Sequence, residues 1–409
     1  MPKRVVVTGM GVISSVGNSV SNYWESLSNG CNGIDKITLF DTKDHQVHIG
    51  GESNIELESF IDKKLLNRID RFTAFALIAS NQAILDSNLD TSKITKQRAG
   101  VIVGTGIGGM NTFETQHKRL LENPKKVSPF FIPSMIPDIA SGYISIEHGF
   151  EGINYAVVSA CSSSAHSIGD AYRNIKHGYS DIIIAGGAEA SITPMAIAGF
   201  SNMKALTKNP DPRKASRPFD KDRDGFVISE GAGILILEEL EHAINRKAKI
   251  YAEIKGFGAT ADTHHITTPH PEAKGAIQSM KSAINEAHVT IEEIQYINAH
   301  GTSTQHNDLI ETKAIKSVFK DSSYDLYVSS TKSMIGHSLG ASGALEAIAT
   351  ILSIQNSTIT PTINYITPDI KCDLNYVPNK SIKKTITNAL SNSFGFGGHN
   401  ATLVISKYD

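Results

Sequence analysis

The chain repeats one order of segments twice, and this repetition constrains its fold more than any other feature of the sequence. Both "VVVTGMG" and "AEIKGFG" are typical of a strand that runs into a Gly-x-Gly-like turn. The second pair has the pattern of a strand followed by a small-residue loop. The third pair has the pattern of a strand, a small-residue loop and then a helix. The three pairs are residues 5–11 with 252–258, 99–109 with 294–304, and 154–170 with 326–344. Three pairs in one order predict two halves of related architecture.

Apolar patterns between these segments predict layers of helix and sheet. Residues 71–89 and 344–355 carry apolar side chains at helical spacing, whereas "DIIIAGG" and "GILILEEL" are typical of fully buried strands. Alternating strands and helices indicate sheets covered by helices, which is the α/β class. We expect the halves to be residues 1–245 and 246–409. They should share a core or a tight interface, because no long linker separates them.

One cysteine, Cys161 in "YAVVSACSSSAHSIG", stands where a strand is expected to end and a helix to begin. Unpaired N–H groups and the dipole at a helix N-terminus favour a thiolate. The same N–H groups can stabilise an oxyanion after the thiolate attacks a carbonyl. A buried, unreactive cysteine is the alternative. Cys31 and Cys372 lack such a setting, and the spacing of the three cysteines does not indicate a zinc site.

Two histidines in the second half are candidate partners of this cysteine, since a nucleophile needs a base or a charge partner. His300 stands in "NAHGTST", and His337 stands in "TKSMIGHSLG", the segment that matches that of Cys161. Doubling with pseudo-symmetry would bring these loops together at one end of the sheets. A separate group in "DTHHITTPHP" could bind a metal, but a plain loop is favoured because no carboxylate pattern accompanies it. Its members are His264, His265 and His270.

Charge and hydropathy narrow the functional classes. A net charge of −2 and a pI near 6.7 give no support for nucleic-acid binding. No apolar segment is long and uncharged enough to cross a membrane. The glycines in "MPKRVVVTGMGVISS" favour a first strand over a signal peptide. We therefore expect a cytoplasmic protein, with the stroma of a plastid less favoured.

Six segments together carry a family resemblance. They are, in order, "VVVTGMGVISSVGNSV", "SACSSSAHSIG", "RPFDKDRDGFVISEGAG", "NAHGTST", "TKSMIGHSLGASGALEA" and "NSFGFGGHN". Over essentially its whole length the chain resembles the β-ketoacyl-[acyl-carrier-protein] synthases of the thiolase superfamily, in particular the members that elongate fatty acids. The resemblance implies a thiolase-like, doubled α/β/α/β/α fold of five layers.

The same resemblance implies a decarboxylative Claisen condensation. Cys161 would take the acyl chain from acyl carrier protein as a thioester. His300 and His337 would bind the malonyl thioester carbonyl, promote loss of carbon dioxide and stabilise the enolate, which attacks the acyl-Cys161 carbonyl. The backbone N–H groups of Cys161 and Phe396 would hold the second oxyanion. The product would be a 3-oxoacyl carrier chain two carbons longer, formed without a metal or a redox cofactor.

Further residues match supporting positions of the family. Lys332 matches the active-site lysine and Glu311 its acidic partner, with Asp308 as a supporting acid; a plain structural ion pair is the alternative. Phe394 and Phe396 match a mobile gate whose glycines act as hinges. The phosphopantetheine arm and the acyl chain would contact Thr267, Thr302, Thr304 and Ile107. Acyl carrier protein would dock on basic residues, for which solvated surface positions are the alternative: Lys63, Lys64, Arg68, Lys125, Lys126 and Lys204.

Other members of the superfamily are the competing hypotheses. A degradative thiolase uses a second cysteine near the C-terminus, and Cys372 lies in no such motif. A chalcone-like or initiation synthase has Asn in place of one histidine, so His337 argues against it. A non-elongating carrier-binding subunit lacks the nucleophile, whereas a polyketide-type ketosynthase shares all three catalytic residues and stays open. We expect a homodimer. Departures from the family pattern, such as His399 where Thr is common, leave the preferred chain length open.

Overall fold

Ten strands form one continuous sheet in the computed structural model, which describes residues 2–408. Their order across the sheet is β10-β9-β13-β14-β8-β1-β7-β6-β4-β5. The strands of the first half are β1 (Val5–Ile13), β4 (Ala99–Gly104), β5 (Asn154–Tyr155), β6 (Ile182–Glu189) and β7 (Gly231–Glu239). Those of the second half are β8 (Ala252–Ala261), β9 (Tyr296–Asn298), β10 (Tyr327–Ser329), β13 (Asn388–Gly395) and β14 (His399–Ser406).

The two halves of the sheet share one strand order and one set of strand directions. In the first half β4 pairs parallel with β5 and β6, while β7 pairs antiparallel with β6 and β1. In the second half β9 pairs parallel with β10 and β13, while β14 pairs antiparallel with β13 and β8. The halves join where β1 and β8 pair antiparallel, from Val5 opposite Ile254 to Val7 opposite Ala252. The predicted doubling of the architecture is confirmed.

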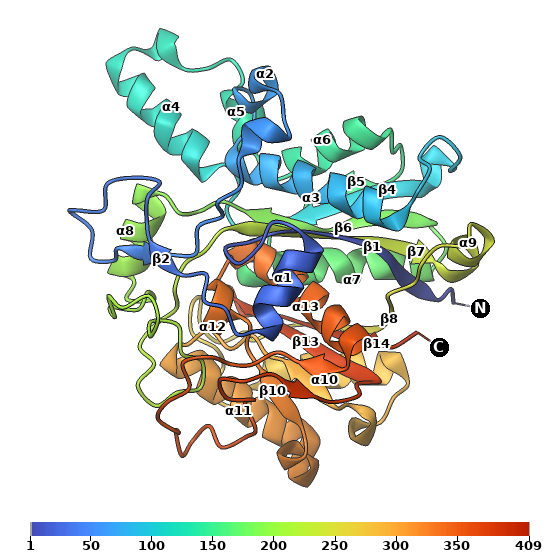
Figure 1. Cartoon of the computed structure of the whole chain (residues 1–409). Helices are drawn as coiled ribbons and strands as arrows, with labels where there is room; N and C mark the ends of the chain where they lie inside the picture. The colour runs from blue at the N-terminus through green and yellow to red at the C-terminus, as the bar shows by residue number, and fades with distance from the viewer. Residues whose placement is uncertain (1, 409) are drawn as a thin grey trace.

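Helices lie in three layers, one between the half sheets and one outside each of them (Figure 1). The outer helices of the first half are α3 (Arg71–Ser87) and α6 (Ile139–His148), and those of the second half are α10 (Lys274–Ala287) and α11 (Gln305–Phe319). Between the halves lie α7 (Ser163–Lys176) and α13 (Ser342–Asn356). These five layers confirm the predicted fold class, and α3 and α13 are the two helices expected from apolar periodicity.

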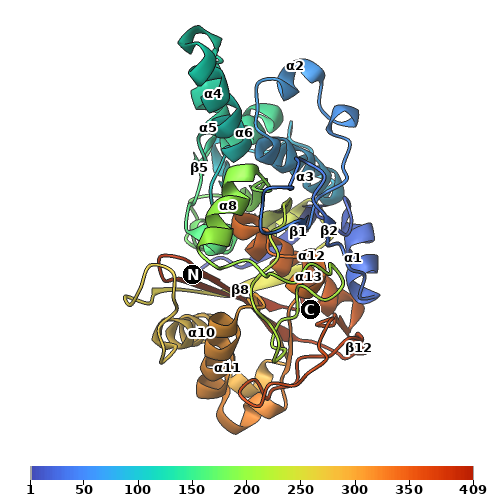
Figure 2. The same cartoon turned by 90° about the vertical axis from the view of Figure 1, so that its left-hand side faces the viewer.

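Shorter elements surround this core. Figure 2 shows α2 and α4 at one end of the molecule and α10 and α11 at the other. The helices are α1 (Val20–Ser28), α2 (Lys63–Leu66), α4 (Met110–Glu122), α5 (Phe131–Met135), α8 (Pro194–Asn202), α9 (Leu240–Asn245) and α12 (Lys332–Ile335). The strands are β2 (Asp35–Lys36), β3 (Ile49–Gly50), β11 (Thr358–Ile359) and β12 (Ile382–Lys383). No helix in residues 2–408 has both the length and the apolar character needed to cross a bilayer.

The turns predicted at the two Gly-x-Gly motifs are wrong, because β1 and β8 both continue through their glycines. A Cβ at Gly11 would overlap the carbonyl oxygen of Ala79 on α3. In the second half, a Cβ at Gly258 would overlap the carbonyl oxygen of Ser279 on α10. The glycines therefore let a helix backbone approach the sheet closely, and they do so at matching places in both halves.

The central helix α13 is buried on every side, because it packs against both half sheets through β7 and β13. Its Ala344, Leu345, Ile348 and Ile351 are all inaccessible to solvent. Burial of each large aliphatic side chain stabilises the fold by about 1.5–3 kcal/mol. A helix enclosed in this way needs no polar face, so the one charged residue in α13, Glu346, has to be explained by its contacts.

Candidate active site

Cys161 lies at the start of α7, as the sequence predicts. The preceding strand is shorter than expected, because β5 is at the edge of the sheet and pairs with β4 at only two positions. After β5 ends at Tyr155, Ala160 takes a φ of 51°, and a 3₁₀ turn over Ala160–Ser162 leads into the helix. Cys161 is 8% exposed, and its accessible part faces a cavity.

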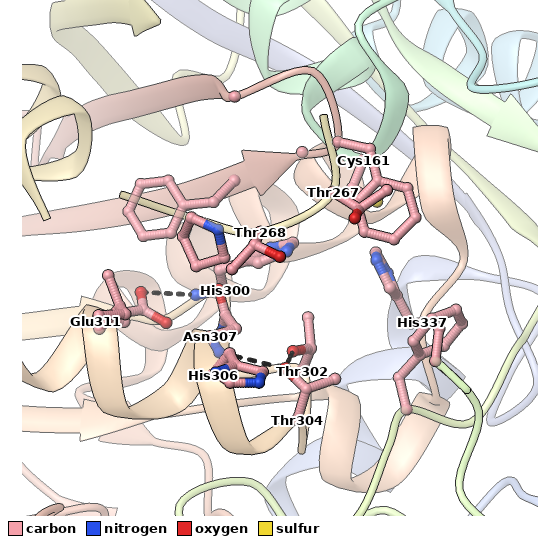
Figure 3. A pocket seen from close by; sticks show the side chains of 18 of the residues that line it. Cys161, Thr267, Thr268, His300, Thr302, Thr304, His306, Asn307, Glu311 and His337 are labelled. Carbon is pink, nitrogen blue, oxygen red and sulfur yellow. Dashed lines mark hydrogen bonds between the residues drawn. The ribbon is translucent and has the colours of Figure 1, made fainter. Parts of the chain in front are cut away.

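This cavity has a volume of about 230 Å³ and is also lined by His300 and His337. Figure 3 shows Cys161, His300 and His337 facing it from three separate segments of the chain. Other predicted residues that line it are Lys204, Thr267, Thr302, Thr304, Glu311, Phe394 and Phe396. The loops that the repeat was expected to bring together therefore do meet in one site.

The two histidines lie side by side and are both neutral. Their ring centroids are 5.3 Å apart with an interplanar angle of 85°, and both residues are buried. Burial, reinforced by the positive charge of Lys332, holds the pKa of both rings well below the ordinary value. A neutral imidazole still donates one hydrogen bond. The pair can therefore stabilise a negatively charged oxygen without being protonated first.

Neighbouring side chains orient both rings. Nζ of Lys332 lies 3.4 Å from Nδ1 of His300. An ammonium group only donates, so Nδ1 accepts and Nε2 carries the proton. Nδ1 of His337 lies 2.9 Å from the hydroxyl of Ser342. The ring of His337 also packs against the ring of Phe226, with centroids 5.1 Å apart. Phe226 lines the cavity. It lies within "RPFDKDRDGFVISEGAG", one of the six segments that carry the resemblance, but no site role was predicted for it.

The predicted ion pair between Lys332 and Glu311 is wrong. Lys332 is buried and pairs with Glu346 of α13. Glu311 instead accepts hydrogen bonds from the backbone N–H groups of His300, at 2.9 Å, and Gly301, at 2.8 Å. The layering explains the difference. α13 places Glu346 in the middle layer beside Lys332, whereas α11 brings Glu311 to the His300 loop from the outer layer.

Glu346 is a site residue that sequence reasoning missed, although a lone glutamate in an apolar helix was an available signal. Burial raises the pKa of Glu346 to about 7, against the opposing charge of Lys332. Burial also raises the pKa of Glu311 to about 7, against its two backbone donors. The second predicted acid, Asp308, lies 3.6 Å from Arg223 and is not among the residues that line the cavity.

The backbone N–H groups of Cys161 and Phe396 face the cysteine sulfur and favour its thiolate. The end of β13 lies so close that a Cβ on Gly395 would be 3.1 Å from the nitrogen of Cys161. Burial nevertheless outweighs these groups and the charge of Lys332, and raises the pKa of Cys161 to about 12. The thiolate predicted for this cysteine is therefore wrong for the unliganded site, in which Cys161 is a thiol.

Most of the predicted substrate contacts lie at the cavity. The hydroxyls of Thr302 and Thr304 are 2.9 Å apart, and Thr267 lines the same space. The ring of Phe394 lies 5.8 Å from that of His300. Ile107 differs, because it is 37% exposed and does not line the cavity. Its loop follows β4, which is one strand away from the open edge of the sheet.

Of the residues predicted to dock a carrier protein, only Lys204 lines the cavity. The side chain of Arg68 covers the ring of Phe130, with its guanidinium carbon 4.7 Å from the ring centroid. The remaining four are exposed on α2 and on a 3₁₀ turn after α4: Lys63, Lys64, Lys125 and Lys126. Their role in docking stays a prediction.

The segment with the three other histidines is a loop, as predicted, because residues 262–273 contain no helix or strand. The rings of His264 and His270 lie 5.2 Å apart. Across residues 2–408, no group of three or more His, Cys, Asp or Glu side chains is arranged to hold a metal ion.

Comparisons with known proteins assign the class of this chain. The family model described as "Beta-ketoacyl synthase, N-terminal domain" matches residues 2–243. The model described as "Beta-ketoacyl synthase, C-terminal domain" matches residues 251–366. The chain belongs to the beta-ketoacyl synthase family and is a condensing acyltransferase with the thiolase-like fold. The resemblance found in the sequence motifs is confirmed.

The similarity extends to particular enzymes. The chain is 52% identical over 409 residues to "3-oxoacyl-[acyl-carrier-protein] synthase 2" of Staphylococcus aureus (strain COL), with 100% of this chain and 99% of that protein covered. It is 49% identical over 409 residues to the protein of the same name from Synechocystis sp., with 99% and 98% covered. These relatives confirm the prediction of a condensing enzyme that elongates fatty acyl chains.

Solved structures give the same fold. A type II PKS acyl-carrier protein in complex with its ketosynthase matches with a TM-score of 0.94 at 33% identity. A beta-ketoacyl synthase from Burkholderia phymatum STM815 matches with a TM-score of 0.92 at 32% identity. In both cases 100% of this chain and 100% of the other chain are covered.

Proposed function

We propose that this enzyme joins a malonyl group on acyl carrier protein to an acyl chain held as a thioester on Cys161. The observation that carries the assignment of residues is the convergence of Cys161, His300 and His337 on one cavity. The name of the relatives, 3-oxoacyl-[acyl-carrier-protein] synthase 2, supports acyl carrier protein as the source of both substrates. We also propose that the enzyme needs no metal or redox cofactor, because no step requires an external electron acceptor. A cytoplasmic location stays a prediction.

In the first half-reaction the sulfur of Cys161 attacks the carbonyl carbon of the acyl thioester. The oxyanion that forms accepts hydrogen bonds from the backbone N–H groups of Cys161 and Phe396. The C–S bond to the carrier then breaks, and the carrier thiol leaves with the proton that Cys161 loses. Because the pKa of Cys161 is about 12, the proton leaves as the sulfur attacks and not in an earlier step.

In the second half-reaction His300 and His337 donate hydrogen bonds to the thioester carbonyl of the malonyl group. The bond to the carboxylate breaks, carbon dioxide leaves, and the electron pair forms an enolate whose oxygen the two N–H groups stabilise. The enolate carbon attacks the carbonyl carbon of acyl-Cys161. The second oxyanion collapses, the C–S bond to Cys161 breaks, and the thiolate takes up a proton. Neutral imidazoles suit this role, since they need no proton from solvent before the reaction.

The cavity mouth fits the arm of a carrier protein. Thr302 and Thr304 offer hydroxyls along the cavity wall, which suits the amides of a phosphopantetheine arm. Exposed Lys204 stands at the same opening and can attract an acidic carrier. The similar PKS ketosynthase was solved in complex with its acyl-carrier protein, which supports the same kind of partner here.

We also propose that two copies pair through β5. This strand is the open edge of the sheet on the side of the first half, and an exposed edge is a ready surface for pairing with another chain. Tyr155 is 38% exposed and Val158 is 55% exposed next to this edge. The exposed Ile107 lies on the loop after the neighbouring β4, so a partner would bury it beside the acyl chain. Size-exclusion chromatography with light scattering tests this, and a monomer at micromolar concentration would contradict it.

Mass spectrometry of the intact protein tests the central proposal. The enzyme is mixed with hexadecanoyl-carrier protein and then with malonyl-carrier protein. We expect an acyl mass on the Cys161 peptide, followed by its transfer into a 3-oxooctadecanoyl-carrier product, and no label on the Cys161→Ala variant. If no acyl-carrier protein, whatever the length of its acyl chain, transfers its acyl group to Cys161, the proposed function is wrong.

A polyketide-type ketosynthase is the second candidate, because the 33% identical structure is a type II PKS ketosynthase bound to a hexaketide. The two activities differ in their products. A fatty acyl synthase releases the chain after one condensation, whereas a polyketide enzyme adds several malonyl units without reduction. Product masses with excess malonyl-carrier protein distinguish them, and a series of unreduced products would favour the second candidate.

A further inference from the structure

The fold builds the same helix start twice, once in each half. α7 follows the 3₁₀ turn Ala160–Ser162, and α13 follows the 3₁₀ turn Leu339–Ala341. Each turn begins at a residue with positive φ, 51° at Ala160 and 44° at Leu339. Each turn also packs against a strand end of the opposite half, the first against β13 and the second against β6. Gly340 therefore stands in the second half where Cys161 stands in the first.

At the first of these helix starts Cys161 lines the substrate cavity, whereas at the second Leu339 lines the same cavity but Gly340 does not. At the second, the carboxylate of Glu189, the last residue of β6, fills the equivalent position. Its Oε2 accepts the N–H of Gly340 at 3.0 Å and the N–H of Gly106 at 2.6 Å. Its Oε1 accepts the hydroxyls of Thr105 at 3.2 Å and Ser191 at 2.9 Å. The Glu189 side chain is inaccessible to solvent.

Four donors satisfy this carboxylate although no cation does. None of the ion pairs within residues 2–408 includes Glu189. A buried carboxylate with neither donors nor a cation would be strongly destabilising. Here, hydrogen bonds from two backbone N–H groups and two hydroxyls offset the cost of burying the carboxylate. The arrangement is therefore a fixed junction between three chain segments.

The junction is tight and lies next to the reacting groups. A Cβ at Gly106 would be 2.7 Å from Oε2 of Glu189, and a Cβ at Gly340 would be 2.8 Å from it. The first of these would also be 3.5 Å from the carbonyl oxygen of Ala160, in the turn that carries Cys161. Gly106 is followed by Ile107, and Gly340 lies three residues after His337.

We propose that Glu189 is a positioning residue of the condensing site. By filling the second helix start with an internal carboxylate, it holds the Ile107 loop and the segment after His337 in fixed places relative to Cys161. The proposal rests on the proposed function, in which Ile107 bounds the acyl chain and His337 binds the malonyl group. Loss of this carboxylate should therefore alter acyl-length preference and malonyl decarboxylation together.

Two substitutions at Glu189 separate the effect of its negative charge from the effect of its hydrogen bonds. In Glu189→Gln the amide oxygen can still accept both backbone N–H groups, and the amide NH₂ can donate to hydroxyls that accept as well as donate. In Glu189→Ala all four hydrogen bonds are lost. The matched control is Glu238→Ala, because Glu238 is equally inaccessible to solvent and touches no segment of the site. Glu238 also accepts four hydrogen bonds, one each from Thr8 and His242 and two from Arg246.

The measurement is the ratio of elongation rates on octanoyl- and hexadecanoyl-carrier protein, together with the rate of malonyl decarboxylation. We expect Glu189→Ala to change the ratio at least tenfold and to slow decarboxylation at least tenfold, with Glu189→Gln between it and the wild type. Glu238→Ala should keep the wild-type ratio even if its melting temperature falls as far as that of Glu189→Ala. A wild-type ratio in Glu189→Ala, or the same change in Glu238→Ala, would overturn the proposal.

If Glu189→Ala does not fold, the double variant Thr105→Val, Ser191→Ala removes the two hydroxyl donors and leaves the carboxylate on its backbone donors. A smaller change of ratio in the same direction is expected, and an unchanged ratio overturns the proposal. Failure of the wild-type enzyme to elongate any acyl carrier is a different result, because it refutes the proposed function and not the role of Glu189.

Discussion

Replacing Lys332 with methionine tests the buried ion pair that supports the histidines. Methionine keeps most of the apolar stem of lysine but leaves Glu346 without its cation, on a helix that is buried on every side. Breaking a buried pair from one side costs about 3–5 kcal/mol of folding free energy while the remaining charge stays ionised. Protonation of Glu346 can reduce this cost, because the pKa of its carboxyl is already about 7 and rises further once Lys332 is gone. Below that pKa it is neutral, and the cost is smaller.

The raised pKa of Glu346 decides how the stability of Lys332→Met changes with pH. Between the pKa of a glutamate in the unfolded chain and the higher pKa in the fold, the folded state holds a proton that the unfolded state has released. Stability of Lys332→Met therefore falls by about 1.4 kcal/mol for each pH unit in this window. The double variant Lys332→Met, Glu346→Gln lacks this carboxyl, while Glu311, whose pKa is also raised to about 7, is present in both variants and cancels from the comparison. From pH 6 to pH 8, the difference in unfolding free energy between the two variants should grow by about 2–3 kcal/mol.

Equilibrium unfolding in guanidinium at both pH values measures this difference. Activity is a second measurement, because both variants lose the ammonium group that orients His300. Each should condense about 10²-fold more slowly than the wild type, although the double variant regains stability. If the two unfolding curves stay parallel between pH 6 and pH 8, Glu346 does not carry a raised pKa, and the account of the buried pair is wrong.

Three further predictions concern the reacting groups. Alkylation of Cys161 by iodoacetamide should speed up about tenfold per pH unit from pH 7 to pH 9, because the pKa of the thiol is about 12; a plateau near pH 8 would show an activated thiolate. Gly395→Ala should slow acylation of Cys161 by about tenfold or more, since the new methyl group would lie 3.1 Å from the Cys161 nitrogen; stopped-flow measurement of carrier release checks this, and an unchanged rate refutes the close packing. Replacing either His300 or His337 with asparagine should stop release of carbon dioxide from malonyl-carrier protein while Cys161 is still acylated, and mass spectrometry combined with carbonate trapping separates the two steps.

Features that recur along the chain could be predicted from the sequence. The three matched segments predicted the doubled fold, because each half is built from the same succession of strands and helices. Cys161, His300 and His337 stand at the ends of elements, so a doubled sheet was enough to bring their loops to one place. The motifs added the reaction, because their combination is specific to one family.

Features that depend on distances between layers could not be predicted. The partner of Lys332 is the glutamate of the middle helix and not Glu311, which depends on how deeply α13 lies between the sheets. The pKa of Cys161 is set by burial more than by the helix start, and burial is not visible in a local pattern. Gly11 was taken for a turn, because a strand glycine that admits a helix backbone looks the same in the sequence. Glu189 looks like the end of a buried strand, and only its four donors show what it does.

The position of the last strands in the sheet has a consequence for biosynthesis. β13 and β14 are the last elements of the chain, yet they lie between β9 and β8 in the interior of the sheet. A ribosome-bound chain that has not yet released these residues has a gap in its second half, and its Cys161 turn lacks the strand end that carries Phe396. Such a nascent chain exposes unpaired strand edges that a chaperone would recognise. Acyl transfer should therefore begin only after β13 and β14 have left the ribosome, when this hairpin closes the sheet and completes the oxyanion hole in one event.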